Sequence, residues 1–135
     1  MNEYANPDAL VSTEWLAEHL EAPDVRVVDG SWHMPQLGRE ARGEFESGHI
    51  PGALNLPFLD LYDPTTKTIK PAAALTALYA AAGVREGAPV TTSCGSGITA
   101  CNLALGLHLI GRDEVAVYDG SWTEWGGRDD TPIER

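Results

Sequence analysis

A cysteine opens a glycine-rich loop in the second half of this 135-residue chain. The loop joins an expected strand over residues 90–93 to an expected helix that runs to Ile110. Gly95 and Gly97 allow the backbone after Cys94 to adopt positive φ angles and to curl around an anion. Backbone N–H groups and the positive end of the helix dipole would then favour the thiolate of Cys94, the nucleophilic form. A buried structural cysteine at a strand end is the alternative interpretation.

A second candidate region is the segment over residues 30–48, which has little regular apolar periodicity. A patternless segment of this length in a small domain is more often functional than idle. Its Arg39 and Arg42 are three residues apart, so one helical face could present both guanidinium groups to a carboxylate. The same spacing suits two solvated surface arginines equally well.

Other residues with chemical potential are less specific. His49 comes just before the turn residues Pro51 and Gly52, where a capping, packing or catalytic role is possible. Cys101 falls in the helix after the Cys94 loop, which is apolar on most sides, so we expect a deeply buried helix and a packed apolar thiol. The four histidines and two cysteines show no metal-ligand spacing and no disulfide framework, so we expect no metal and no cofactor.

Apolar and β-branched runs predict the elements that position these side chains. Strands are expected over residues 25–29, 53–56, 90–93 and 115–118. Ser12 suits the cap of a helix that begins at Thr13, and a further helix from Pro71 should end at Gly83. This alternation predicts an α/β fold, with a mostly parallel sheet covered by helices on both faces. Ligands in such folds bind at the carboxyl ends of the strands, where Cys94 falls.

The length and charge of the chain limit the classes of function and partner that it can have. The chain fits a flexible leader over residues 1–10 and one domain over residues 11–135. A formal net charge of −11 argues against nucleic acid and anionic membranes as partners, because both require a cationic face. No apolar run approaches the ~18 residues of a transmembrane helix, and the first residues lack the features of a secretory signal. We therefore expect a cytoplasmic protein.

Four segments together resemble the rhodanese family, and within it the 3-mercaptopyruvate sulfurtransferases. They are Val-Val-Asp at 27–29, Gly-His-Ile-Pro-Gly-Ala at 48–53, Cys-Gly-Ser-Gly-Ile-Thr-Ala at 94–100 and Tyr-Asp-Gly-Ser-Trp-Thr-Glu-Trp at 118–125. The resemblance covers nearly the whole chain and implies the three-layer α/β rhodanese fold. That implication agrees with the fold class that the apolar pattern predicts.

The resemblance also implies a persulfide mechanism. The Cys94 thiolate would attack the sulfur of 3-mercaptopyruvate, release pyruvate and carry the sulfur as a persulfide. A thioredoxin-like protein, a small thiol or cyanide would then accept it. Backbone N–H groups of the loop would stabilise the anionic persulfide without side-chain charge, and the binding positions there are Gly95, Gly97, Ile98 and Thr99.

Five more side chains receive roles from the same resemblance. Ser96 matches the family's catalytic serine and would deliver a proton to the enolate-like leaving group. His49 and Glu40 would form its relay, with Glu40 standing where relatives more often show aspartate. Arg39 and Arg42 would hold the substrate carboxylate.

Alternative activities stay open at this point. Thiosulfate-using relatives usually place cationic residues after the cysteine, where this chain has Gly95 and Ser96, so thiosulfate is the second choice of donor. A cysteine phosphatase would need an arginine near the end of the loop, and residues 98–101 offer none. A persulfide carrier without small-donor turnover would not need the two arginines of the long segment.

The assembly also has two possibilities. Residues 11–53 resemble the beginning of the N-terminal domain of a two-domain relative, and residues 54–135 resemble the end of its C-terminal domain. The long segment would complete the site over its own Cys94 in a monomer, or over the cysteine of a partner chain in a homodimer.

Overall fold

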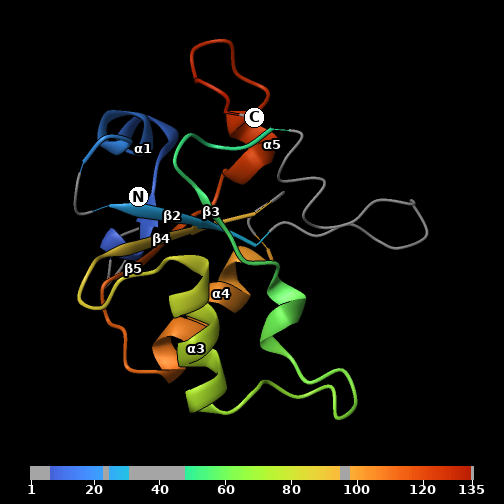
Figure 1. Ribbon diagram of the computed structural model, residues 1–135. Coiled ribbons are helices and arrows are strands. Elements are labelled where there is room, and N and C mark those ends of the chain that lie inside the picture. Colours follow the sequence, from blue (N-terminus) through green and yellow to red (C-terminus); the bar gives the residue numbers. More distant parts are fainter. Residues whose placement is uncertain (1–6, 23–24, 31–47, 95–97, 135) are drawn as a thin grey trace.

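The computed structural model describes residues 7–22, 25–30, 48–94 and 98–134. Five parallel strands form one sheet in the order β1-β5-β4-β2-β3 (Figure 1). In chain order the strands are β1 (Leu10–Val11), β2 (Arg26–Asp29), β3 (Leu54–Asn55), β4 (Val90–Ser93) and β5 (Val115–Tyr118). β4 lies at the centre and all four of its residues are buried, as expected for a strand of a parallel sheet covered on both faces.

Helices cover both faces of this sheet, which confirms the predicted three-layer α/β fold (Figure 1). One face packs against α1 (Thr13–His19) and α5 (Ser121–Trp125). The other face packs against the 3₁₀ helix η3 (Phe58–Leu61), α3 (Ala72–Ala82) and α4 (Ala100–Leu109). Neighbouring residues of β2 divide between the layers, since Val27 joins the first cluster and Val28 the second.

Local signals set several element boundaries as predicted. The Ser12 side chain caps α1 by accepting a hydrogen bond from the Trp15 backbone N–H at 3.1 Å. Gly83 ends α3 in the left-handed conformation, with a φ of 104°. No helix in the described part of the chain is long and apolar enough to cross a membrane.

The beginning of the chain differs from the expected leader. Residues Pro7–Ala9 form a 3₁₀ turn, and Leu10 pairs in parallel with Val117 as the start of β1. A strand of two residues is too short to show a period-2 pattern in the sequence. It is recognised as a strand only through its pairing with β5. Residues 1–6 lie outside the described residues.

The prediction of a deeply buried α4 is wrong for the outer side of that helix. Leu103 and Leu107 are fully buried, whereas Leu105 and Leu109 are 46% and 48% exposed. Cys101 is exposed as well, so it is not the packed thiol that we expected. The reason is that α4 lies in an outer layer, where only the side facing the sheet is covered.

Gly106 is the point at which α4 approaches Tyr79 of α3. The Tyr79 hydroxyl is buried and donates a hydrogen bond of 2.8 Å to the Leu103 carbonyl. A Cβ atom at position 106 would collide with this hydroxyl oxygen. Alanine gains ~1 kcal/mol over glycine in helix propensity, but overpacking a tight core costs ~1–3 kcal/mol. The collision therefore outweighs the propensity.

We expect Gly106→Ala to lower the free energy of unfolding by about 1 kcal/mol in urea titrations. Adding Tyr79→Phe removes the crowding oxygen, so the double variant should lose less than the sum of the two single losses. Stabilisation by Gly106→Ala alone, or strictly additive losses, would contradict this packing.

Candidate active site

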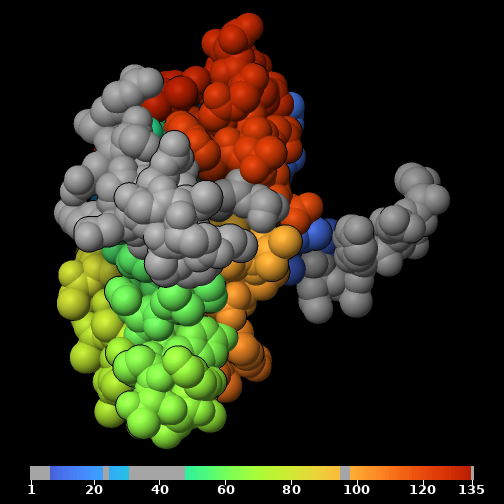
Figure 2. Space-filling view, turned by 90° about the vertical axis from the view of Figure 1, so that its right-hand side faces the viewer, coloured from blue at the N-terminus to red at the C-terminus, as the bar shows by residue number. Residues whose placement is uncertain are grey.

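Cys94 lies directly after the carboxyl end of the central strand β4 and is 1% exposed. The adjacent strand β2 ends in register with it, since Asp29 pairs with Ser93 and the Gly30 N–H donates to the Ser93 carbonyl at 2.8 Å. Figure 2 views the molecule from this side, with η3 and the following turn in green, α4 in orange and the C-terminal residues in red. The thiol thus occupies the edge of the sheet predicted for a site.

Ser121 fixes the backbone of Cys94. Its hydroxyl accepts a hydrogen bond from the Cys94 N–H at 3.1 Å and donates one to the Tyr118 carbonyl at 2.8 Å. The next residue, Trp122, donates its N–H to the Cys94 carbonyl at 2.9 Å. Both backbone polar groups of Cys94 are therefore held by the first two residues of α5.

Ser121 is fully buried and adopts the left-handed conformation, with a φ of 52°. Non-glycine residues rarely adopt this conformation, and where they do it is over-determined by their surroundings. Ser121 is not among the functional residues predicted from the sequence. The available signal was its place just past the strand that ends at Tyr118, because carboxyl ends of parallel strands meet at one edge.

His49 is 6% exposed and lies on the segment that leads into β3. Its backbone forms an antiparallel bridge with Glu134, with N–H to carbonyl distances of 2.9 and 3.0 Å in the two directions. The imidazole Nε2 lies 2.9 Å from Glu134 Oε1, and the Gly52 N–H reaches the same oxygen at 3.5 Å. These hydrogen bonds, that of His49 first, hold the pKa of the Glu134 carboxyl below its usual value.

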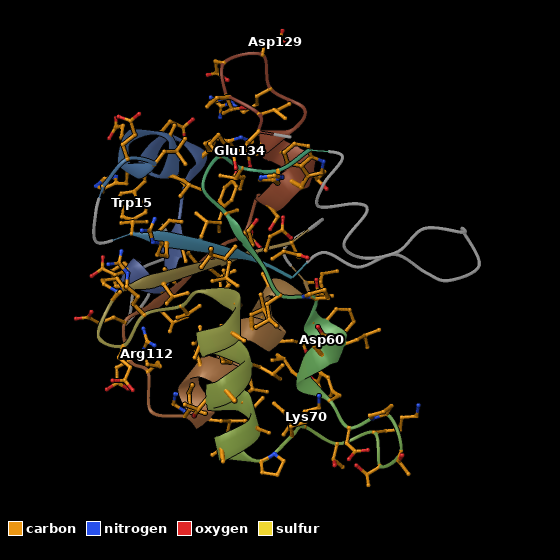
Figure 3. All side chains as sticks on the ribbon, in the orientation of Figure 1. Trp15, Asp60, Lys70, Arg112, Asp129 and Glu134 are labelled. Atoms are coloured by element: carbon orange, nitrogen blue, oxygen red, sulfur yellow. The ribbon has the colours of Figure 1, made fainter. Side chains whose placement is uncertain are left out.

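Trp122 links the His49 segment to the Cys94 segment. Its backbone contacts Cys94, and its indole packs so closely on Gly48 that a Cβ at position 48 would lie 3.2 Å from Trp122 Cζ2. Gly48 is the neighbour of His49 in the chain. Glu134, labelled in Figure 3, comes from the C-terminal segment and completes this group. The sequence offered no signal for Glu134, because the pairing joins residues that are 85 positions apart.

The remaining predicted site residues have different outcomes. Ile98 is 75% exposed and Thr99 is half-buried, both just before α4. Six predicted positions lie outside the described residues: Arg39, Glu40, Arg42, Gly95, Ser96 and Gly97. Within the described ranges there is no cluster of three or more His, Cys, Asp or Glu side chains that could hold a metal ion.

Comparison with known proteins defines the class. Residues 12–128 match the Rhodanese-like domain, and the chain belongs to this family. The solved structure of SseA from Escherichia coli, described as a 3-mercaptopyruvate sulfotransferase, superposes with a TM-score of 0.68 at 29% identity. That superposition covers 90% of this chain and 45% of the other. An anaerobic ergothioneine biosynthesis enzyme from Chlorobium limicola shares the fold, with a TM-score of 0.78 at 22% identity over 96% of this chain and 32% of its own.

Curated relatives are more similar in sequence. The Arabidopsis thaliana protein named thiosulfate/3-mercaptopyruvate sulfurtransferase 1, mitochondrial, is 39% identical over 117 residues, which are 87% of this chain and 29% of that protein. The Escherichia coli 3-mercaptopyruvate sulfurtransferase is 35% identical over 135 residues, which are 98% of this chain and 47% of that protein. The chain thus spans less than half the length of these relatives.

Two substitutions of Ser121 distinguish the contribution of its hydroxyl to the folding free energy from the contribution of its backbone conformation. Ser121→Ala and Ser121→Gly both leave the Cys94 N–H without its partner, which should cost about 1–3 kcal/mol of folding free energy. Alanine pays ~1–2 kcal/mol to adopt the left-handed conformation, which glycine adopts without this strain. Glycine loses ~0.4–1 kcal/mol more backbone entropy than alanine on folding, so its net advantage over alanine is smaller. We expect urea unfolding to rank the proteins wild type, then glycine, then alanine. An alanine variant as stable as the wild type would contradict the role of the hydroxyl.

The His49–Glu134 pair predicts a pH dependence. The folded-state pKa of Glu134 lies below its ordinary value of 4.5. The ionised Glu134 carboxylate therefore stabilises the folded state fully above that pH, and this stabilisation is lost as pH falls through the folded-state pKa. Glu134→Gln should therefore unfold with a weaker pH dependence below about pH 4.5 than the wild type. The Glu134 side chain is half exposed, so the difference should be only about 0.5 kcal/mol.

The exposed Glu21→Gln is a suitable control for this comparison, because it removes one carboxylate from α1's C-terminal side without touching His49. Urea unfolding in steps between about pH 7 and pH 3 measures the effect. If the free energy of unfolding changed with pH equally in the wild type, Glu134→Gln and the control, the His49–Glu134 pair would not favour the ionised carboxylate.

Proposed function

We propose that this chain is a sulfurtransferase that takes sulfur from 3-mercaptopyruvate as a persulfide on Cys94. The observation that carries the proposal is the placement of Cys94, a buried thiol at the carboxyl end of β4 with both backbone groups hydrogen-bonded. Relatives named 3-mercaptopyruvate sulfurtransferase in Homo sapiens and Escherichia coli, 36% and 35% identical, support the choice of donor.

The first chemical step forms one bond and breaks one. The Cys94 thiolate attacks the sulfur of 3-mercaptopyruvate, a sulfur–sulfur bond forms, and the carbon–sulfur bond breaks. The electron pair of the broken bond leaves with the carbon fragment as the enolate of pyruvate, which then takes up a proton. In a second step a thiolate acceptor attacks the outer sulfur and regenerates the Cys94 thiolate. The acceptor would be a thioredoxin-like protein or a small thiol.

Proton delivery falls to Ser96, with His49 and Glu40 as its relay. Of these, His49 lies in the described structure, and the Glu134 carboxylate fixes the orientation of its ring through the 2.9 Å hydrogen bond. A relay histidine needs such a partner, because the group that holds one ring nitrogen sets which nitrogen carries the proton. We therefore propose that Glu134 is a positioning residue for His49.

Binding of the substrate must overcome the charge of the protein. A net charge of −11 repels an anionic α-keto acid at long range, so the site requires its own cations. Arg39 and Arg42 are proposed to hold the carboxylate. The N–H groups contributed by Gly95, Gly97, Ile98 and Thr99 are proposed to hold the persulfide.

Thiosulfate is the second candidate donor. The names of some relatives support it, since the Arabidopsis thaliana proteins carry thiosulfate in their names and a Gallus gallus relative, 36% identical, is named thiosulfate sulfurtransferase. The absence of a cationic side chain at positions 95 and 96 favours the monoanionic donor over the dianion. A persulfide carrier would turn over neither donor.

Steady-state assays with both donors and a thiol acceptor test the proposal. We expect kcat/KM to be higher for 3-mercaptopyruvate than for thiosulfate, and Cys94→Ser to lower pyruvate formation by at least about 1000-fold. Cys101→Ser is the matched control, because it removes the other cysteine of the chain from an exposed position and should retain activity. A higher kcat/KM for thiosulfate would reassign the donor, and turnover by Cys94→Ser would overturn the mechanism.

A further inference from the structure

A cavity lies at the amino ends of β4 and β5, whereas Cys94 follows the carboxyl end of β4. Its volume is about 670 Å³, within the range of about 300–1,000 Å³ that is usual for small-molecule sites. Figure 3 labels Trp15, which lines the cavity, on the left of the molecule, and Asp60 on the right. The cavity and the candidate active site are therefore at opposite edges of the sheet.

The floor of the cavity is the side of the sheet that faces α1. Thr91 of β4 and Ala116 of β5 are paired neighbours that both line it, and Val25 adds a third residue just before β2. Adjacent residues of a strand point to opposite faces, and Val90 belongs to the cluster on the α3 side. The Thr91 side chain therefore points to the α1 side, into the cavity.

Thr91 is the polar residue of this floor. It is 3% exposed, and its hydroxyl makes no hydrogen bond with any residue that the structure describes. A buried hydroxyl without a partner is costly, because it has given up its hydrogen bonds to water. A molecule in the cavity that offers an N–H group would supply the missing partner. This hydroxyl is the observation that points to a ligand.

Three exposed acidic residues also line the cavity: Asp8, Asp113 and Glu114. None of them pairs with a basic side chain in the described part of the chain. Arg112 precedes Asp113 but donates its hydrogen bonds to two backbone carbonyls of the loop before β4. Among the residues given for the cavity lining there is no Lys or Arg. The cavity thus combines an apolar floor with unpaired negative charge.

We propose that this cavity binds an organic ammonium ion with an apolar body. The carboxylates attract the ammonium group, and the Thr91 hydroxyl accepts an N–H of the ligand. The Trp15 ring stacks on His19 with centroids 4.0 Å apart, which holds the indole in place beside the acidic residues, where it suits a cation–π contact. The same carboxylates repel an anionic α-keto acid, so this ligand differs in charge from the proposed sulfur donor.

Three probes that share an indole body test the preference for positive charge. Tryptamine is a cation, tryptophol is neutral and indole-3-acetate is an anion. Titration of the isotope-labelled chain, followed by two-dimensional NMR, measures both the affinity and the place of binding. We expect tryptamine to shift the backbone N–H signals of Thr91 and Ala116 with a Kd of about 1 mM or lower. Tryptophol should bind about tenfold more weakly, and indole-3-acetate should not bind.

Variants assign the charge and the hydroxyl to their residues. Asp113→Asn with Glu114→Gln should weaken tryptamine binding about tenfold and leave tryptophol binding unchanged. Thr91→Val keeps the shape of the side chain and should weaken tryptamine binding about two- to tenfold, which corresponds to one hydrogen bond. Asp60→Asn is the matched control, because Asp60 is exposed on η3 and does not line the cavity.

The NMR spectrum of each free variant reports whether it is folded, so a loss of binding is separated from a loss of structure. Four outcomes would overturn the proposal. They are no binding of tryptamine, equal affinities for the three probes, signal changes around Cys94 instead of Thr91, and tryptamine binding that the Asp113→Asn, Glu114→Gln variant leaves unchanged.

Discussion

The hydrogen bonds of the Ser121 hydroxyl are the interaction on which the candidate site depends. This buried hydroxyl joins the carbonyl of Tyr118 at the end of β5 to the N–H of Cys94 at the end of β4. A buried N–H without a partner costs about 1–3 kcal/mol, so the two strand ends are held in one arrangement. The thiol thereby begins its loop from a fixed backbone position.

The C-terminal segment supports both halves of the proposed chemistry. Trp125 anchors α5 in the core, and its indole N–H donates to the Pro132 carbonyl at 2.7 Å. α5 holds Cys94 through its first residues, and a few positions further Glu134 pairs with His49. Residues 121–134 thus position a nucleophile and a relay candidate that lie 45 positions apart in the chain.

The sequence predicted those features that local physics determines. A β-branched run specified β4, the Ser12 cap specified the start of α1, and a glycine that tolerates positive φ specified the end of α3. The two-residue strand β1 and the His49–Glu134 bridge were not predictable, because their partners are distant in the chain. The exposed side of α4 was predicted wrongly because a helix that is apolar on most sides is expected to be buried all round, whereas only the side of α4 that faces the sheet is covered.

We propose above that Cys94 receives sulfur from 3-mercaptopyruvate. The most direct measurement is the intact mass of the protein after incubation with this donor and without a thiol acceptor. We expect the wild type and Cys101→Ser each to gain the mass of one sulfur atom, a thiol to remove it, and Cys94→Ser to gain nothing. An unchanged wild-type mass, or a gain that persists in Cys94→Ser, would contradict it.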